Sequence, residues 1–202
     1  LPDQHGCGVP HVAKGTAEKA RAKIQDNLAE WGALIDEADY IVTSCSSCAF
    51  ALQKEWGYYM GGELINKVRD KTVHITALIA EKLPELSLKA ESLSVAYHTP
   101  CHLRQLKDNT SSWKVLSNVE GMKAVSLKNT CCGMAGSWGI SAKHYDESVK
   151  IANPMIMSLL DSDCTICATY CPTCEMQLKH LSDKLIFNHV ELVDKMLSPK
   201  GQ

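Results

Sequence analysis

Apolar residues recur every three or four positions in two stretches of the chain, at residues 17–35 and 145–159. In the first stretch, for example, Ile24 and Leu28 fall on the same side of a helix. This spacing is typical of an α-helix with one apolar face. The pattern therefore predicts two helices that pack against a core, and we expect Pro154 to kink the second, because proline removes an intrahelical hydrogen bond.

Short runs rich in β-branched and aromatic residues separate the helical stretches, and such runs favour strands. They lie at residues 40–43, 73–76, 93–99, 124–127, 165–170 and 185–190. Strands that alternate with helices usually pair in parallel, with the helices covering the sheet. The sequence therefore predicts an α/β protein with mainly parallel strands and flanking helices.

Cysteine patterns repeat once along the chain. A glycine-flanked cysteine is followed by a C-x-x-C motif after 36 residues in the first half and after 37 in the second: Gly6-Cys7-Gly8 with Cys45-x-x-Cys48, and Cys131-Cys132-Gly133 with Cys171-x-x-Cys174. This self-similarity indicates two tandem, similar modules, which we place at residues 1–90 and 91–202. We expect the first module to be truncated at its N-terminal end, because its counterpart of Cys101 would lie upstream of Leu1.

Composition narrows the classes of function. The formal net charge is −2, and no Lys/Arg-rich stripe occurs, so we expect no nucleic acid partner. No signal-peptide pattern and no apolar run of about 18 residues is found. Ten of the 202 residues are cysteines in tight groups. Disulfide-stapled secreted proteins are richer in cysteine, so the pattern favours metal binding in a reducing compartment.

Several cysteines follow directly after predicted strands, where α/β sheets open their ligand crevice. Five thiolates in the second module exceed the four ligands that a structural zinc ion accepts, so an iron–sulfur cluster fits the count better. A zinc site and a set of buried thiols remain the alternatives. The five predicted ligands are Cys101, Cys131, Cys132, Cys171 and Cys174.

Other residues near these cysteines have supporting or structural roles in this interpretation. We expect His98 and His102, which flank Cys101, to support the cluster rather than to bind it. Cys164 and Cys167 extend the line of cysteines, but three-residue spacing on a strand directs side chains to opposite faces. We therefore expect both of them to pack in the core.

Four segments together resemble the cysteine-rich CCG domain family. That family includes the B and D subunits of heterodisulfide reductase and iron–sulfur subunits of respiratory dehydrogenases, and the segments are most similar to the C subunit of anaerobic glycerol-3-phosphate dehydrogenase. The segments are Val95-Ala-Tyr-His-Thr-Pro-Cys-His102, Cys131-Cys-Gly-Met-Ala-Gly-Ser-Trp-Gly139, Cys171-Pro-Thr-Cys-Glu-Met-Gln177 and Asn188-His-Val190.

The resemblance implies that the five cysteines of the second module bind a [4Fe-4S] cluster, in cubane or non-cubane form. Cys7, Cys45 and Cys48 would belong to a second cluster in the first module. Gly6 stands where the family has a cysteine. The three thiolates would then hold a cluster with an open or foreign ligand, or the site is degenerate or completed by an upstream segment. A ferredoxin-type module, common in the family, would lie upstream or on a separate chain.

The resemblance also implies a role in anaerobic respiration. We expect an oxidoreductase subunit that relays electrons from a flavoprotein dehydrogenase of the glycerol-3-phosphate, lactate or glycolate type toward quinone or a membrane subunit. It would be cytoplasmic or peripheral on the inner face of the cytoplasmic membrane. The alternative is a heterodisulfide-reductase-like subunit that reduces a disulfide at a non-cubane cluster.

Overall fold

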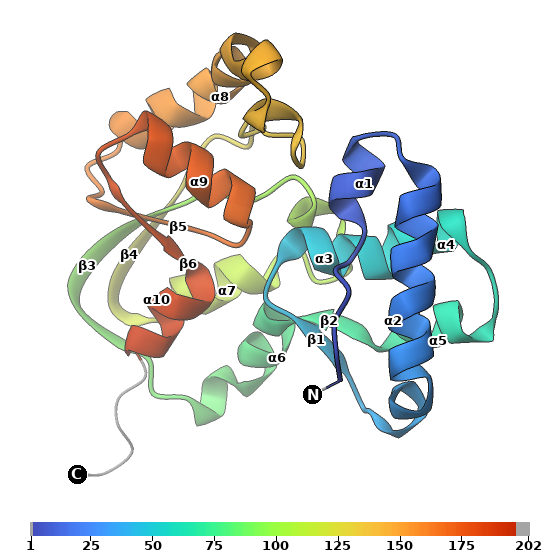
Figure 1. Cartoon of the computed structure of the whole chain (residues 1–202). Helices are drawn as coiled ribbons and strands as arrows, with labels where there is room; N and C mark the ends of the chain where they lie inside the picture. Colours follow the sequence, from blue (N-terminus) through green and yellow to red (C-terminus); the bar gives the residue numbers. More distant parts are fainter. Residues whose placement is uncertain (1, 197–202) are drawn as a thin grey trace.

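The first part of the chain is mostly helical and surrounds a two-stranded parallel sheet (Figure 1). The computed structural model describes residues 2–196. In β1 and β2, Ile41 pairs with Thr72 and Thr43 pairs with His74. The elements are α1 (Val9–Ala13), α2 (Ala17–Glu37), β1 (Ile41–Thr43), α3 (Ser46–Phe50), the π-helical turn η1 (Ala51–Glu55), α4 (Trp56–Tyr59), α5 (Glu63–Lys71), β2 (Thr72–His74), α6 (Ile75–Lys82) and η2 (Leu83–Glu85).

The second part is built on a four-stranded parallel sheet with the strand order β4-β3-β5-β6. Its central strands pair through Val95 with Ile166 and Tyr97 with Ala168. The elements are β3 (Lys89–Tyr97), η3 (Leu103–Gln105), α7 (Ser111–Ser117), β4 (Glu120–Ser126), η4 (Trp138–Ile140), η5 (Ala142–His144), α8 (Tyr145–Leu160), β5 (Ile166–Thr169), α9 (Pro172–Leu181), β6 (Leu185–Asn188) and α10 (His189–Met196).

The α/β class with parallel strands and flanking helices is confirmed, and each of the six predicted strands is present. The two predicted helices are α2 and α8, and α8 continues through Pro154 to its end at Leu160. The structure matches the repeat, because β1 and α3 follow α2 in the same order as β5 and α9 follow α8. The boundary between the modules, at residues 90 and 91, stays a prediction. The predicted second module, residues 91–202, extends beyond the described residues.

Two strands end earlier than the sequence predicted, because a helix begins inside each predicted run. The backbone N–H of Thr76 donates to His74 Nδ1 at 3.5 Å, and that of Val190 donates to Asn188 Oδ1 at 3.0 Å. Both side chains satisfy a free amide in the first turn of a helix, as N-cap residues do. The two modules therefore use equivalent positions to turn a strand into a helix.

The two parts share one core. Ala49 of α3 and Ala80 of α6 belong to the same buried apolar cluster as Tyr97 and Tyr170 of the second part. The rings of His74 and Tyr170 are perpendicular, with centroids 4.9 Å apart. Because protein interiors are close-packed, this contact fixes the position of one module on the other.

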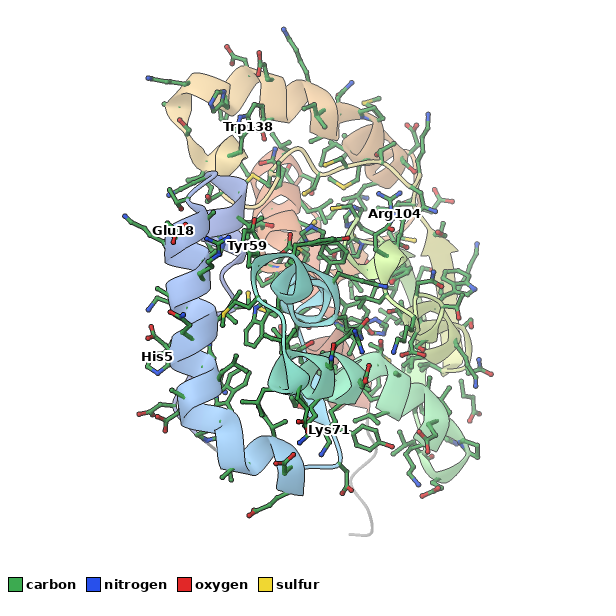
Figure 2. All side chains as sticks on the ribbon, turned by 90° about the vertical axis from the view of Figure 1, so that its right-hand side faces the viewer. His5, Glu18, Tyr59, Lys71, Arg104 and Trp138 are labelled. Atoms are coloured by element: carbon green, nitrogen blue, oxygen red, sulfur yellow. The ribbon has the colours of Figure 1, made fainter. Side chains whose placement is uncertain are left out.

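Lys71, labelled in Figure 2, closes the C-terminal end of α2. Its ammonium group donates to the carbonyl oxygens of Ile35, Asp36 and Ala38 at 2.6, 3.1 and 2.7 Å. The last carbonyls of a helix have no partner within the helix, and a cation also suits its negative end. Among residues 2–196, none of the helices is long and apolar enough to cross a bilayer.

Acid should destabilise the fold through its buried histidines. Burial lowers the pKa of His74 to about 4 and that of His189 well below its ordinary value of 6.5. Between pH 6.5 and 4 the unfolded chain then binds more protons than the folded chain, so the free energy of unfolding falls as the pH falls. Each such proton contributes a slope of about 1.4 kcal/mol per pH unit, measurable by urea unfolding.

The matched variant is His74→Asn, because Asn188 already caps a helix at the equivalent position. The variant should retain the cap and lose one titrating group. Its slope between pH 6.5 and 4 should therefore be smaller by about 1.4 kcal/mol per pH unit. Identical slopes for the two proteins would show that His74 is not buried in the neutral form.

Candidate metal centre

One cavity of about 240 Å³ is bordered by all five cysteines predicted in the second module. They come from three places that follow β3, β4 and β5, so the carboxyl ends of parallel strands bring distant cysteines together. The five are Cys101, Cys131, Cys132, Cys171 and Cys174.

The loop after β4 presents two adjacent cysteines through a glycine with a positive φ. Gly133 has φ +81°, and its backbone N–H donates to Cys131 Sγ at 3.3 Å. A β-carbon at this position would overlap the backbone carbonyl of Ser148 on α8. Glycine is therefore required here, both for the turn and for the close packing of the loop on α8.

The C-x-x-C motif spans the start of α9. Cys171 is the N-cap with an extended backbone, and Cys174 lies in the first turn, after Pro172 at the first helical position. The sulfur of Cys174 lies 3.1 Å from that of Cys132. The positive end of the helix dipole therefore faces the sulfur atoms, which favours their ionised form.

The thiol groups share protons unequally. Hydrogen bonds from Cys101 and Cys132, together with the amide of Gly133, lower the pKa of Cys131 to about 2. In return the hydrogen bond to Cys131 raises the pKa of Cys132 to about 12, and that of Cys101 rises for the same reason. A hydrogen bond from Cys174 and a weaker one from Thr173 lower the pKa of Cys171 to about 5.

These five sulfur atoms fit a group that carries several positive charges. An ionised thiol raises the pKa of its neighbours, so all five lose their protons together only when cations lie among them. An iron–sulfur cluster meets this condition with cysteine ligands. Among residues 2–196, no three His, Cys, Asp or Glu side chains are arranged around the position of a single metal ion.

The cysteines of the first module also gather. The sulfur atoms of Cys48 and Cys7 lie 3.1 Å apart, and a hydrogen bond from Cys48 lowers the pKa of Cys45 to about 7. Gly8 has φ +87° and matches Gly133, which has φ +81°. Cys7 and Cys48 border a separate, mainly apolar cavity of about 350 Å³. A second cluster held by these three cysteines stays a prediction.

Comparison with known proteins identifies the family. A family model described as a cysteine-rich domain, CCG, matches residues 2–53 and 95–179. The chain belongs to the CCG cysteine-rich domain family. The two matched segments contain all eight predicted cysteine ligands, and they end near the two C-x-x-C motifs.

Several curated relatives of this CCG protein are parts of redox enzymes. It is 31% identical over 184 residues to the C subunit of anaerobic glycerol-3-phosphate dehydrogenase from Escherichia coli K12, covering 89% of the chain and 46% of the relative. It is 26% identical to the B subunit of fumarate reductase (CoM/CoB) from Methanothermobacter marburgensis, with coverages of 98% and 40%. It is 28% identical to the D subunit of dihydromethanophenazine:CoB–CoM heterodisulfide reductase from Methanosarcina barkeri, with coverages of 79% and 41%. The chain thus spans less than half the length of each.

The first module of the CCG protein forms one wall of the five-cysteine cavity. Val9, Val12 and Ala13 of α1 border it, next to the glycine-rich loop that carries Trp138, labelled in Figure 2. A β-carbon on Gly136 would come within 2.9 Å of the side chain of Ala13. The candidate site therefore lies between the modules rather than inside one of them, which the sequence did not predict.

Two hydroxyl groups contact a predicted ligand and were also missed. Thr173 Oγ1 lies 3.1 Å from Cys171 Sγ, and Ser47 Oγ of the first module lies 3.7 Å from the same sulfur. Ser47 and Thr173 occupy the same position, directly before the second cysteine, in the two C-x-x-C motifs. The repetition of a hydroxyl residue at that position is the sequence signal from which a role for Ser47 and Thr173 beside the cysteines could have been predicted.

Cys164 and Cys167 are 2% and 0% exposed and lie in the apolar cluster beneath α8, so core packing is confirmed for both. The expected alternation along a strand does not apply to them, because Cys164 precedes β5, which begins at Ile166. His98 is buried and its Nδ1 lies 3.1 Å from Thr169 Oγ1, whereas His102 borders the cavity.

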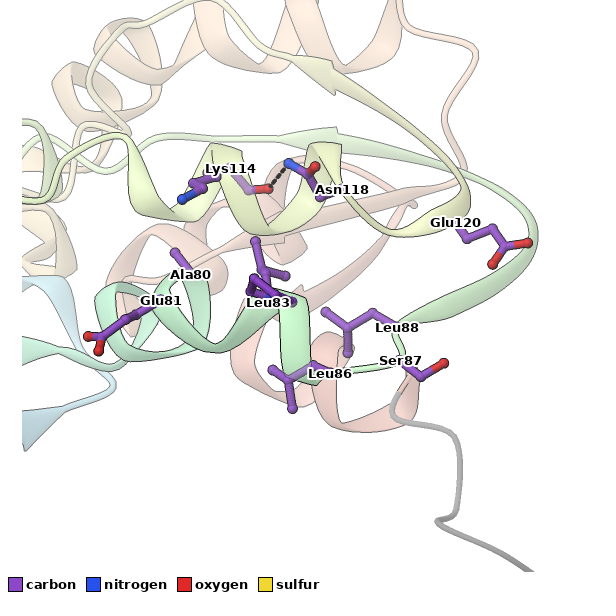
Figure 3. Close-up of a pocket in the computed structure, with 10 residues that line it drawn as sticks. Ala80, Glu81, Leu83, Leu86, Ser87, Leu88, Lys114, Asn118 and Glu120 are labelled. Carbon is purple, nitrogen blue, oxygen red and sulfur yellow. Dashed lines mark hydrogen bonds between the residues drawn. The ribbon is translucent and has the colours of Figure 1, made fainter.

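A further cavity of about 680 Å³ lies between α6 and α7 (Figure 3). Leu83, Leu86 and Lys114 are among its lining residues, and the side-chain amide of Asn118 donates to the Lys114 carbonyl at 2.7 Å. No cysteine within the described chain lines it. We place no part of the predicted site there.

Proposed function

We propose that this CCG protein is an iron–sulfur electron-transfer subunit of a respiratory dehydrogenase. The observation that carries the proposal is the single cavity bordered by five cysteines from three strand ends. Its proposed [4Fe-4S] ligands are Cys101, Cys131, Cys132, Cys171 and Cys174. Cys7, Cys45 and Cys48 are the proposed ligands of a second cluster.

A bound cluster supplies a one-electron redox couple. The surrounding residues set the conditions for it: the Gly133 amide and the Thr173 hydroxyl lie at hydrogen-bond distance from sulfur atoms. Val9 and Val12 of α1 cover part of the cavity with apolar surface. Exclusion of water and hydrogen bonds donated to sulfur are two means by which a protein adjusts a cluster's reduction potential.

The proposed partners are supported by the similarity to curated relatives. Similarity to the C subunit of anaerobic glycerol-3-phosphate dehydrogenase supports a flavoprotein dehydrogenase as the electron donor. The substrate of that donor would be glycerol-3-phosphate, lactate or glycolate. Electrons would pass to quinone or a membrane subunit at the inner face of the cytoplasmic membrane, through a ferredoxin-type domain upstream or on another chain.

A second candidate function is disulfide reduction, as in the heterodisulfide reductase that the chain resembles. The observation that favours it is the exposure of Cys101 at the cavity, which gives a small molecule access. In the reaction a disulfide takes up two electrons from a reduced partner and two protons from water. Its sulfur–sulfur bond breaks, and two thiols leave.

Metal analysis of the anaerobically purified full-length protein tests both candidates. Iron and sulfide should be present in equal amounts, and the reduced protein should give an electron paramagnetic resonance signal. A folded protein that is colourless and contains zinc instead would refute both functions. The same result would favour a zinc-stabilised interaction module.

Two assays separate electron transfer from disulfide reduction. For electron transfer, the dehydrogenase substrate added to the whole complex should reduce flavin and cluster together, and a cluster that stays oxidised would contradict the proposal. For disulfide reduction, an artificial electron donor should support thiol formation from CoM–S–S–CoB. No turnover by the fully loaded protein would exclude that candidate.

A further inference from the structure

Three side chains form a polar chain that crosses from one module to the other. His102 Nδ1 lies 2.9 Å from Ser47 Oγ, and Ser47 Oγ lies 3.7 Å from Cys171 Sγ. Ser47 is in α3 of the first module, whereas His102 and Cys171 belong to the second. A ligand of the proposed cluster is therefore in contact with a hydroxyl group from the other module.

The surroundings hold this chain in place. The ring of Phe50, one turn along α3, stacks on the ring of His102 with centroids 4.6 Å apart and planes 8° from parallel. The backbone N–H of Ser46 donates to the carbonyl oxygen of Tyr170 at 3.2 Å. These contacts anchor both ends of α3 to the second module, so Ser47 has a defined position beside Cys171.

The chemistry of the sulfur fixes the direction of the hydrogen bonds. A ligand thiolate has no proton and only accepts, so the Ser47 hydroxyl donates to Cys171 Sγ. The Ser47 oxygen is then free to accept from His102, which carries its proton on Nδ1. His102 thereby orients the hydroxyl toward the sulfur.

We infer that Ser47 is a positioning residue by which the first module raises the reduction potential of the second module's cluster, with His102 acting through it. The inference rests on the proposed function. A hydrogen bond to a ligand sulfur withdraws electron density and stabilises the more negative, reduced cluster. Thr173 also contacts Cys171 but belongs to the C-x-x-C motif itself. The Ser47 contact exists only when the modules are docked.

Potentiometric titration of the full-length holoprotein, followed by electron paramagnetic resonance, tests this inference. Ser47→Ala should retain its iron and lower the reduced-to-oxidised ratio at a fixed ambient potential by about tenfold. For a one-electron couple this is a downward shift of about 59 mV. Ser47→Thr keeps the hydroxyl and should restore most of the ratio.

His102→Phe separates positioning from packing, because a phenyl ring still stacks on Phe50 but donates no hydrogen bond. It should lower the potential less than Ser47→Ala does, and adding it to Ser47→Ala should give no further shift, since both act through one hydroxyl. Ser46→Ala is the neighbouring control: its hydroxyl lies 3.5 Å from the Tyr170 carbonyl oxygen. We expect no shift there.

The outcomes distinguish the inference from the proposed function. If the unmodified protein contains no iron–sulfur cluster, the proposed function fails. If the cluster is present and Ser47→Ala leaves its potential unchanged, only this inference fails. If Ser47→Ala loses its iron, His102→Phe decides: an unchanged potential overturns the inference, and a downward shift supports it.

Discussion

Replacing Cys132 by alanine should abolish binding of the cluster in the second module. Cys132 is 4% exposed, borders the five-cysteine cavity and lies 3.1 Å from the sulfur of Cys174. In the proposed five-cysteine site every thiolate is a ligand, so removing one leaves an iron atom without its sulfur. In the anaerobically prepared full-length protein, the bound iron and sulfide of this module and its visible absorption should be lost.

Cys164→Ala is the matched control. Cys164 is 2% exposed and belongs to the same apolar cluster as Cys132, so the two changes remove equal volumes from the same core. In the cluster-free protein each change should cost about 1 kcal/mol of unfolding free energy. In the loaded protein Cys164→Ala should keep its iron, whereas Cys132→Ala should also lose the stability that the bound cluster adds. If Cys132→Ala retained full iron, or if Cys164→Ala lost it, the assignment of ligands would be wrong.

The fold was largely predictable, because periodicity reports directly on burial. The apolar spacing around Ile24 and Ile156 belongs to helices whose buried faces meet the core. The cysteine repeat predicted the matching order of elements in the two parts. Sequence periodicity placed the end of β2 too late. The strand ends at His74 because the Nδ1 atom of this residue caps α6. Such a cap depends on a single side chain, so a periodic pattern does not reveal it.

The gathering of the five cysteines was predictable from topology, since each follows a parallel strand. The position of the first module was not. Val9 borders the cavity and Ser47 contacts Cys171 only because the two modules dock on each other, and the apolar pattern of each module alone does not show how they dock. Docking is decided by core residues, among them Ala49 and Tyr170, whose apolar character indicates burial but not the partner.

Replacing Gly133 by alanine should have the second largest effect. The residue has φ +81°, and its new β-carbon would collide with the backbone carbonyl of Ser148, which a rotamer change cannot relieve. We expect a loss of about 3 kcal/mol of unfolding free energy, measured by urea denaturation. We also expect incomplete iron loading, because the loop that presents Cys131 and Cys132 must move away from α8.

Gly32→Ala controls for the added methyl group. Gly32 lies within α2, and a β-carbon there meets no atom within 4 Å. Alanine has a higher helix propensity than glycine, so this variant should be about 1 kcal/mol more stable than the unmodified protein, with unchanged iron. If Gly133→Ala behaved like Gly32→Ala, the loop would be loose enough to adapt. The positive φ would then have no part in holding the paired cysteines at the cavity.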